Sequence, residues 1–233
     1  MKVRNSLVSN SSSSSFIVVF HEKPQSLSEV HKILFNEGDG FLSLDYHDGS
    51  LSYKEISERV FNDLKNKKRA TKRELLEEFS TVVYHKLWKI EDDISHHIVD
   101  YTTTMRCCEL FGNDKIINII KEYNKIDKKW ADERTMLWND YGITYQTDHK
   151  DWPKKFIKED ADLNEKRLKD IRPLWDKKDK LITKAADKMA KEFIENHKSW
   201  WYTILSYADD GGDSIMEHGN IFSHIEHIKI SHH

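Results

Sequence analysis

The strongest constraint on the fold is a five-residue apolar block, residues 16–20, that directly follows a run of five serines, residues 11–15. The block is β-branched and aromatic, and it does not alternate with polar residues, which is typical of a short buried strand. A serine run is ordinarily a flexible linker. Because only ten residues precede this one, we interpret it as a loop that leads into the buried strand.

Strand-like segments also occur near the C-terminus. Residues 200–207 are aromatic-rich and almost continuously apolar, and residues 225–231 alternate as a half-exposed strand would. Because strands at both ends enclose helical patterns, we expect the two ends to share one sheet. The sequence therefore predicts an α+β fold, in which a small mixed β-sheet formed by residues 1–49 and 199–233 carries a large, mostly α-helical insertion.

The helical insertion is predicted over residues 50–198. A capping box at residues 52–55 begins its first helix, and a single helix is predicted over residues 93–111. Residues 113–198 are predicted to form a long helical hairpin, in which Pro173 should kink or break the second helix. The low numbers of turn residues, 8 Gly and 3 Pro, agree with a helix-rich chain.

The charge balance and the cysteines argue against several classes of protein. The 37 basic and 40 acidic residues leave a net charge of -3, so no global field attracts nucleic acid or an anionic membrane. Cys107 and Cys108 are adjacent, which suits a reducing compartment better than a disulfide scaffold. No signal-peptide core is present, and no apolar stretch approaches the roughly 20 residues that span a bilayer. We expect a cytoplasmic protein without membrane contact.

The serine run and its flanks are the first candidate site. Hydroxyls and backbone amides of a loop could converge on a phosphate, and an arginine would add a charged fork. The P-loop pattern Gly-x-x-x-x-Gly-Lys is missing from the sequence, so this would be a different kind of anion site. A merely polar loop is the alternative. The ligand-binding residues of this hypothesis are Arg4, Asn10, Ser11, Ser12, Ser13, Ser14 and Ser15.

The C-terminal tail is the second candidate site. Five of the 13 histidines lie in the last 25 residues, beside an acidic, Gly-rich loop. His218, Asp210 and Asp213 are the candidate catalytic residues, either for acid–base chemistry or for orienting a ligand. A divalent metal held by the imidazoles and carboxylates is a second interpretation, although their spacing matches no zinc motif.

A third cluster of acids and histidines occupies residues 92–97. On a helix, Asp93 and His97 would face the same side, as two metal ligands could. The simpler explanation is a solvated first helical turn, where the helix dipole favours acidic side chains. We therefore expect a structural role for these residues.

Both ends of the chain resemble one known group of sequences. The Arg-Asn-Ser, Val-Ser-Asn and poly-Ser-Phe strings within residues 4–16 are similar to the N-terminal signature of a broad group of uncharacterised phage and bacterial proteins. Residues 209–213 and 217–219 correspond to an Asp/Gly loop and a Glu-His-Gly step in that group. The resemblance implies that the two termini form one site and that the protein is of phage or prophage origin. It carries no activity.

Two functions are consistent with these patterns. The first is a cytoplasmic, phage-encoded protein that binds a small anionic ligand, phosphate-bearing or a nucleotide, between the serine loop and the tail. Phosphoester or glycosidic chemistry on that ligand is left open. The second is a non-enzymatic interaction protein, such as an inhibitor or adaptor of a host protein, that uses the helical hairpin as its surface. The unexplained polar residues concentrate at the termini, which favours the first.

Overall fold

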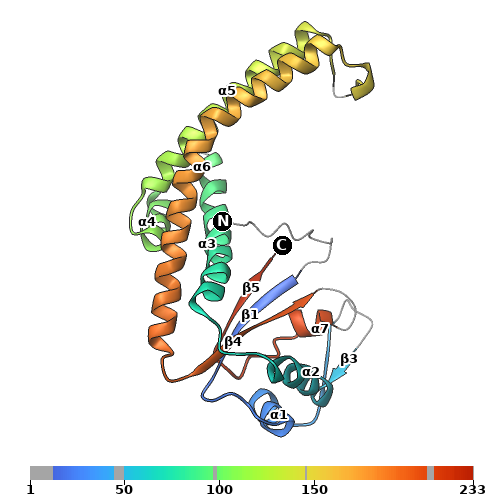
Figure 1. Ribbon diagram of the computed structural model, residues 1–233, viewed down its shortest axis with the longest axis vertical. Helices are drawn as coiled ribbons and strands as arrows, with labels where there is room; N and C mark the ends of the chain where they lie inside the picture. Colours follow the sequence, from blue (N-terminus) through green and yellow to red (C-terminus); the bar gives the residue numbers. More distant parts are fainter. Residues whose placement is uncertain (1–12, 45–49, 97–98, 145, 209–212, 233) are drawn as a thin grey trace. The chain divides into compact units, whose positions relative to one another are not determined.

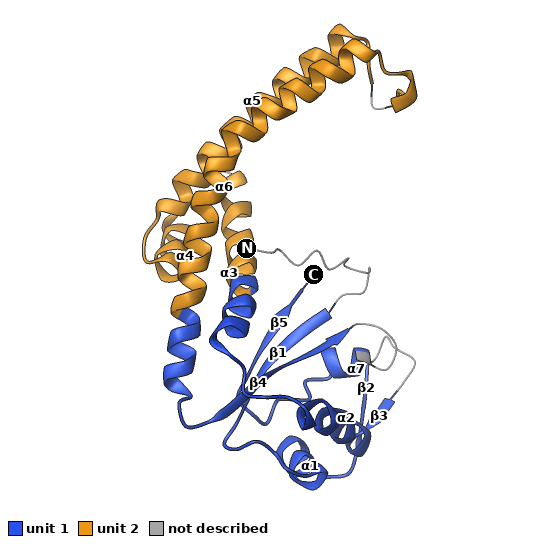
Figure 2. Cartoon of the chain, in the orientation of Figure 1, with its two compact units in different colours: residues 1–81, 189–233 blue, residues 82–188 orange. Residues whose placement is uncertain are grey.

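The chain folds as two compact units (Figures 1 and 2). Unit 1 comprises Met1–Thr81 and Met189–His233, and unit 2 comprises Val82–Lys188. The two segments of unit 1 therefore end at residue 81 and begin again at residue 189, whereas the predicted boundaries were at residues 49 and 199. The residues that this computed structural model describes are 13–44, 50–96, 99–144, 146–208 and 213–232.

Unit 1 is built on a three-stranded sheet. The N-terminal strand β1 (Ser13–Phe20) lies between two C-terminal strands, β4 (Trp201–Ala208) and β5 (His227–Ser231) (Figure 1). Phe16 is paired with Leu205 on one side and with Lys229 on the other. The α+β fold with a sheet formed by both ends of the chain is confirmed. Both ladders are antiparallel, where a mixed sheet was expected.

Strand β1 begins three residues earlier than predicted. We expected a loop up to residue 15, but Ser13, Ser14 and Ser15 are strand residues. Ser14 and Ser15 are paired with both neighbouring strands, and the Ser13 carbonyl accepts a hydrogen bond from the amide of His232. The backbone of a central strand is occupied by its ladders. These three serines therefore cannot supply the converging loop amides that we predicted for an anion.

One face of β1 packs against helices α1 (Leu27–Phe35) and α2 (Tyr53–Lys65). Phe16, Val18 and Phe20 belong to one buried cluster with apolar residues of both helices. Helix α2 begins at the predicted capping box, with the Ser52 hydroxyl accepting from the Glu55 amide. Because α2 buries its apolar face in this cluster, it is part of the sheet unit. The predicted insertion at residues 50–198 is therefore shorter in the structure.

The opposite face of β1 is covered by parts of two long helices, α3 (Lys72–Ser95) and α6 (Lys154–Asn196). Tyr202, which is paired with Val19, packs against Phe193, with 5.1 Å between the centroids of the two rings. Phe193 in turn packs against Phe79, with 5.8 Å between the ring centroids. Complete burial of one such side chain contributes about 1.5–3 kcal/mol. The non-alternating sequence of residues 16–20 thus reflects a strand that is buried on both faces.

A short ladder separates α1 from α2. Strand β2 (Phe41–Ser43) pairs antiparallel with β3 (Ser50–Ser52), and these strands form a sheet of their own. Neither β2 nor β3 therefore joins the main sheet.

Unit 2 consists of helices. It contains the second part of α3, α4 (Tyr101–Phe111), α5 (Lys115–Asp140), the 3₁₀ turn η1 (His149–Asp151) and most of α6 (Figure 2). Ion pairs between α5 and α6 at Arg134–Asp160 (2.7 Å) and Asp127–Arg167 (2.5 Å) show that these two helices are antiparallel. None of the helices in the described residues has both the length and the hydrophobicity of a membrane-spanning segment.

One helix prediction in unit 2 is wrong, and of the kink or break predicted at Pro173 the break is not observed. The single helix predicted over residues 93–111 is divided, because α3 ends at Ser95 and Asp100 caps the start of α4. Helix α6 continues through Pro173. The buried side chains of Ile171 and Leu174 flank this proline, and their packing outweighs the roughly 3 kcal/mol that a proline costs inside a helix.

Candidate functional site at one end of the sheet

Buried polar side chains gather at the end of the unit 1 sheet where β1 begins. Ser14, Ser15 and Glu217 are all buried there, and Glu217 is only 1% exposed. Glu217 belongs to the short helix α7 (Asp213–His218), which lies in sequence between β4 and β5. A buried carboxylate is costly unless hydrogen bonds compensate it. The partners of these residues therefore define what this end of the sheet can do.

The first polar cluster joins Ser14 to helix α7. The Ser14 hydroxyl donates to Glu217 Oε1 at 2.6 Å, and His218 Nε2 lies 3.8 Å from Glu217 Oε2. Lys229 Nζ donates to the backbone carbonyl of Glu217 at 2.7 Å. The His218 side chain is 26% exposed, so it can contact a ligand from solvent. This cluster combines a fixed carboxylate with an accessible imidazole.

The second polar cluster surrounds Ser15. Its hydroxyl lies 2.7 Å from His232 Nε2 and 3.2 Å from the Ser206 hydroxyl, and Glu78 Oε2 lies 3.5 Å from the same His232 nitrogen. A Ser-His-acid relay needs the acid on the imidazole nitrogen opposite the hydroxyl. Here the Ser15 hydroxyl and the Glu78 carboxylate both approach Nε2 of His232, and Ser15 is buried. We assign this cluster a structural role.

The two clusters separate serines that we expected to act together. Successive residues of a strand point to opposite faces of the sheet, so Ser14 contacts Glu217 while Ser15 contacts His232. The expected proximity of the N-terminal serines and the C-terminal tail is nevertheless observed. Several predicted site residues lie outside the described residues: Arg4, Asn10, Ser11, Ser12 and Asp210, together with the side chain of Asp213.

Glu217 is the central residue of the first cluster, and the sequence-based site did not include it. A signal was present in the sequence, since Glu217 follows Ile215 and Met216 and precedes Ile221 and Phe222. All four apolar residues are buried. An acidic residue among residues with this pattern is a candidate for a buried polar group.

The neighbouring Gly219 has a steric role. A Cβ atom at this position would lie 2.5 Å from the Ile215 carbonyl oxygen, which already accepts a hydrogen bond from the Gly219 amide at 2.8 Å. The obstacle is backbone, so the end of α7 must shift to accept any other residue. Within the Glu-His-Gly step, glycine therefore allows the chain to pass close to the Ile215 carbonyl at the end of α7.

We expect Gly219→Ala to lower the free energy of unfolding by about 1–3 kcal/mol, the usual cost of overpacking. Chemical denaturation of wild type and variant measures this difference. Ser223→Ala, at an exposed position four residues away, is the control and should stay within about 0.5 kcal/mol of wild type. Equal stability of Gly219→Ala and Ser223→Ala would contradict the close approach.

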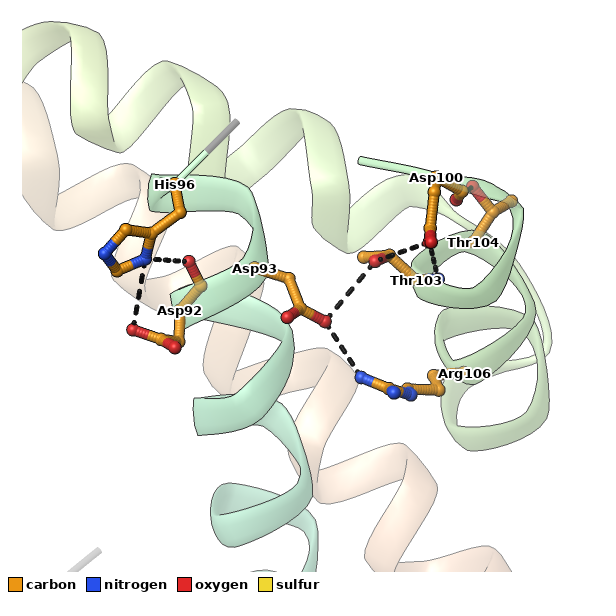
Figure 3. Close-up of polar contacts among 7 residues, drawn as sticks. All are labelled: Asp92, Asp93, His96, Asp100, Thr103, Thr104 and Arg106. Carbon is orange, nitrogen blue, oxygen red and sulfur yellow. Dashed lines mark hydrogen bonds and ion pairs between the residues drawn. The ribbon is translucent and has the colours of Figure 1, made fainter. Parts of the chain in front are cut away.

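Asp93 joins the end of α3 to α4, whereas Asp92 contacts His96 within the last turns of α3 (Figure 3). Asp93 Oδ2 accepts from Arg106 Nη1 at 2.8 Å and lies 3.4 Å from the Thr103 hydroxyl. These residues are in the last turn of α3, not in a first turn as we expected, and His97 lies outside the described residues. Within the ranges that the structure describes, no three His, Cys, Asp or Glu side chains are grouped to hold a metal ion.

The cap of α4 leads to a prediction on pH dependence. The Thr103 amide donates to the Asp100 carboxylate and holds the pKa of Asp100 below its ordinary value (Figure 3). A lowered pKa in the folded state adds stability above the pKa of the unfolded state, about 3.9, and this stability is lost as the pH falls through the folded-state pKa.

Asp100→Asn retains a capping acceptor but removes the charge. We expect the variant to have a lower melting temperature than wild type near neutral pH, and the difference should disappear as the pH falls below about 3.9. Melting curves recorded from acid to neutral pH measure this. A difference that is the same at every pH would show that the carboxylate charge is not responsible.

Comparison of the chain with protein-family models, with curated protein sequences and with solved structures gave no match. The functional inference therefore rests on the chemistry of the side chains. Histidine is the side chain that gains and loses a proton near neutral pH. The first cluster can accordingly bind an anion at His218 or transfer a proton there.

Proposed function

We propose that the protein binds a small phosphate-bearing ligand of the nucleotide class at this end of the sheet, with His218 in contact with the ligand. The observation that best supports this proposal is the buried Ser14–Glu217 hydrogen bond. It links the serine run to the Glu-His-Gly step, two segments separated by 203 positions in the chain. A buried carboxylate is retained at a cost, and here it lies beside the one accessible imidazole of the cluster.

The residues of the site have two roles: some position the His218 imidazole, and others contact the ligand. Ser14 and Glu217 are buried and hold each other, so they position the His218 imidazole. The His218 imidazole can donate a hydrogen bond to phosphate oxygens, and the Lys229 ammonium, which is bound to the Glu217 carbonyl, supplies positive charge. Arg4, Asn10, Ser11, Ser12 and Asp210 stay predicted site residues, since they lie outside the described residues.

An acid–base step at His218 on a phosphoester or glycosidic bond is the reaction class that fits this imidazole. We place the function in the cytoplasm of a phage-infected or prophage-carrying bacterium. Cys107 and Cys108 are both free thiols, which supports a reducing compartment.

A ligand panel tests the proposal by thermal unfolding of the full-length protein. The panel contains inorganic phosphate, mononucleotides and dinucleotides, and it is applied to wild type, His218→Ala and His224→Ala. His224 is an exposed histidine of the same unit and serves as the matched control. A ligand at 100 times its Kd stabilises the folded state by about 2.7 kcal/mol. We expect at least one nucleotide to raise the melting temperature of wild type and His224→Ala but not of His218→Ala.

Two results would overturn the proposal. The first is that no phosphate-bearing compound changes the melting temperature of wild type. The second is that His218→Ala responds to the ligand as strongly as wild type, because the imidazole would then not contact it.

Partner binding by unit 2 is the second candidate function, and one observation favours it. Trp88 of α3 is 69% exposed and Trp175 of α6 is 38% exposed. Large exposed aromatic side chains are typical of interaction surfaces, where tryptophan is enriched among the residues that dominate binding. The non-enzymatic alternative predicted from the sequence would then use α3 and α6 together.

A further inference from the structure

A cavity of about 280 Å³ opens between α3, α5 and α6 within unit 2. Two of the residues that line it, Ile120 and Leu174, have buried apolar side chains. Three aromatic residues from the three helices also line it: Trp88, Tyr123 and Trp175. This volume is sufficient for one long side chain.

The charges around the cavity are unequal. Two carboxylates, Glu91 and Asp92, and one ammonium, Lys178, line it. Lys178 Nζ lies 2.9 Å from Glu91 Oε1, and this ion pair is mostly buried. Asp92 is on the exposed side, with 71% of its side chain accessible and His96 Nδ1 3.4 Å from its Oδ1. The accessible part of the lining therefore has a carboxylate in excess.

We propose that this cavity receives a lysine or arginine side chain of a partner protein, an inference that rests on the partner-binding function of unit 2. The face of a tryptophan ring attracts a cation more strongly than any other side-chain ring. The aliphatic stem of lysine or arginine covers apolar surface while its charged end stays near solvent. Here the stem lies on Ile120 and Leu174, the charged end reaches Asp92, and the tryptophan rings flank it.

An acidic side chain is disfavoured at the same place. It would approach Glu91 and Asp92, and the one cation of the lining, Lys178, is already paired with Glu91. An apolar side chain would cover Ile120 and Leu174 but would leave the Asp92 carboxylate without a partner from the ligand. The Asp92 carboxylate and the tryptophan rings therefore both favour a basic side chain of the partner.

Fluorescence anisotropy of labelled peptides with the full-length protein tests the proposal. The probes are a Gly/Ser peptide that carries spaced arginines and its twin with glutamates, at about 0.15 M salt. Trp88→Leu keeps the apolar surface but removes the ring, and Asp92→Asn removes the charge. Tyr101→Leu changes an equally exposed aromatic residue of α4 that does not line the cavity.

We expect the arginine peptide to bind and the glutamate peptide not to bind. Trp88→Leu and Asp92→Asn should each weaken binding about 2–5-fold, whereas Tyr101→Leu should bind as wild type does. Equal binding by Trp88→Leu and wild type, or no binding of the arginine peptide, would overturn the proposal. If the glutamate peptide binds and Trp88→Leu abolishes this, partner binding stands and only the choice of a cation is wrong.

Discussion

Replacing Phe16 with alanine should lower the free energy of unfolding by about 3–5 kcal/mol, the range found for truncated core phenylalanines. Phe16 is buried in the central strand. The centroid of its ring lies 5.1 Å from that of Phe222 and 6.0 Å from that of Tyr207. The Lys229 ammonium is 5.7 Å from the same ring. Truncation therefore removes contacts to three segments that are close only in the folded chain.

Chemical denaturation at equilibrium measures this loss, with Phe41→Ala as the matched control. Phe41 is 72% exposed on β2, so its truncation should change the stability by less than about 0.5 kcal/mol. A loss below about 1 kcal/mol for Phe16→Ala would mean that residue 16 is not in a packed core. The two-sided burial of β1 would then be wrong.

The parts of the fold that were predicted correctly have local signals. The predicted capping box at residues 52–55 marks the start of α2. This signal depends on hydrogen bonds within the first turn of the helix. The uninterrupted apolar character of residues 16–20 likewise reflects burial on both faces.

The errors concern features that depend on distant residues. Ser13, Ser14 and Ser15 have no strong strand preference of their own, and their conformation comes from pairing with β4 and β5. Pro173 stays inside α6 because buried neighbours on both sides hold the helix. The strength of such tertiary packing cannot be read from the residues around one position.

The same dependence on distant residues explains why the candidate site was predicted only in part. The sequence showed serine hydroxyls near the N-terminus and imidazoles near the C-terminus. It did not show which of these side chains form hydrogen bonds with each other. Once Ser14 and Ser15 are in a strand, alternation sends them to different faces. The apolar neighbours of Glu217 indicate a buried acid, but they do not show its partner, because the Ser14 hydroxyl is 203 positions away in the chain.

Removing the Ser14 hydroxyl should cost about 1.5–3 kcal/mol of stability, because a buried carboxylate then loses a donor at 2.6 Å. The cost should depend on Glu217. In a Glu217→Met background, Ser14→Ala replaces the second member of the pair by an apolar group, which is nearly neutral when both partners are removed. We therefore expect a coupling energy of about 1–3 kcal/mol from the double-mutant cycle, measured by chemical denaturation.

The same four proteins separate stability from function. If Glu217 positions His218, the Glu217→Met variant should lose the nucleotide-dependent rise in melting temperature even where it remains folded, while the exposed-histidine control His224→Ala keeps it. A purely structural Ser14–Glu217 pair would give the coupling energy and leave the ligand response unchanged. Equal costs of Ser14→Ala in both backgrounds would instead show that the hydrogen bond does not join the two ends of the chain.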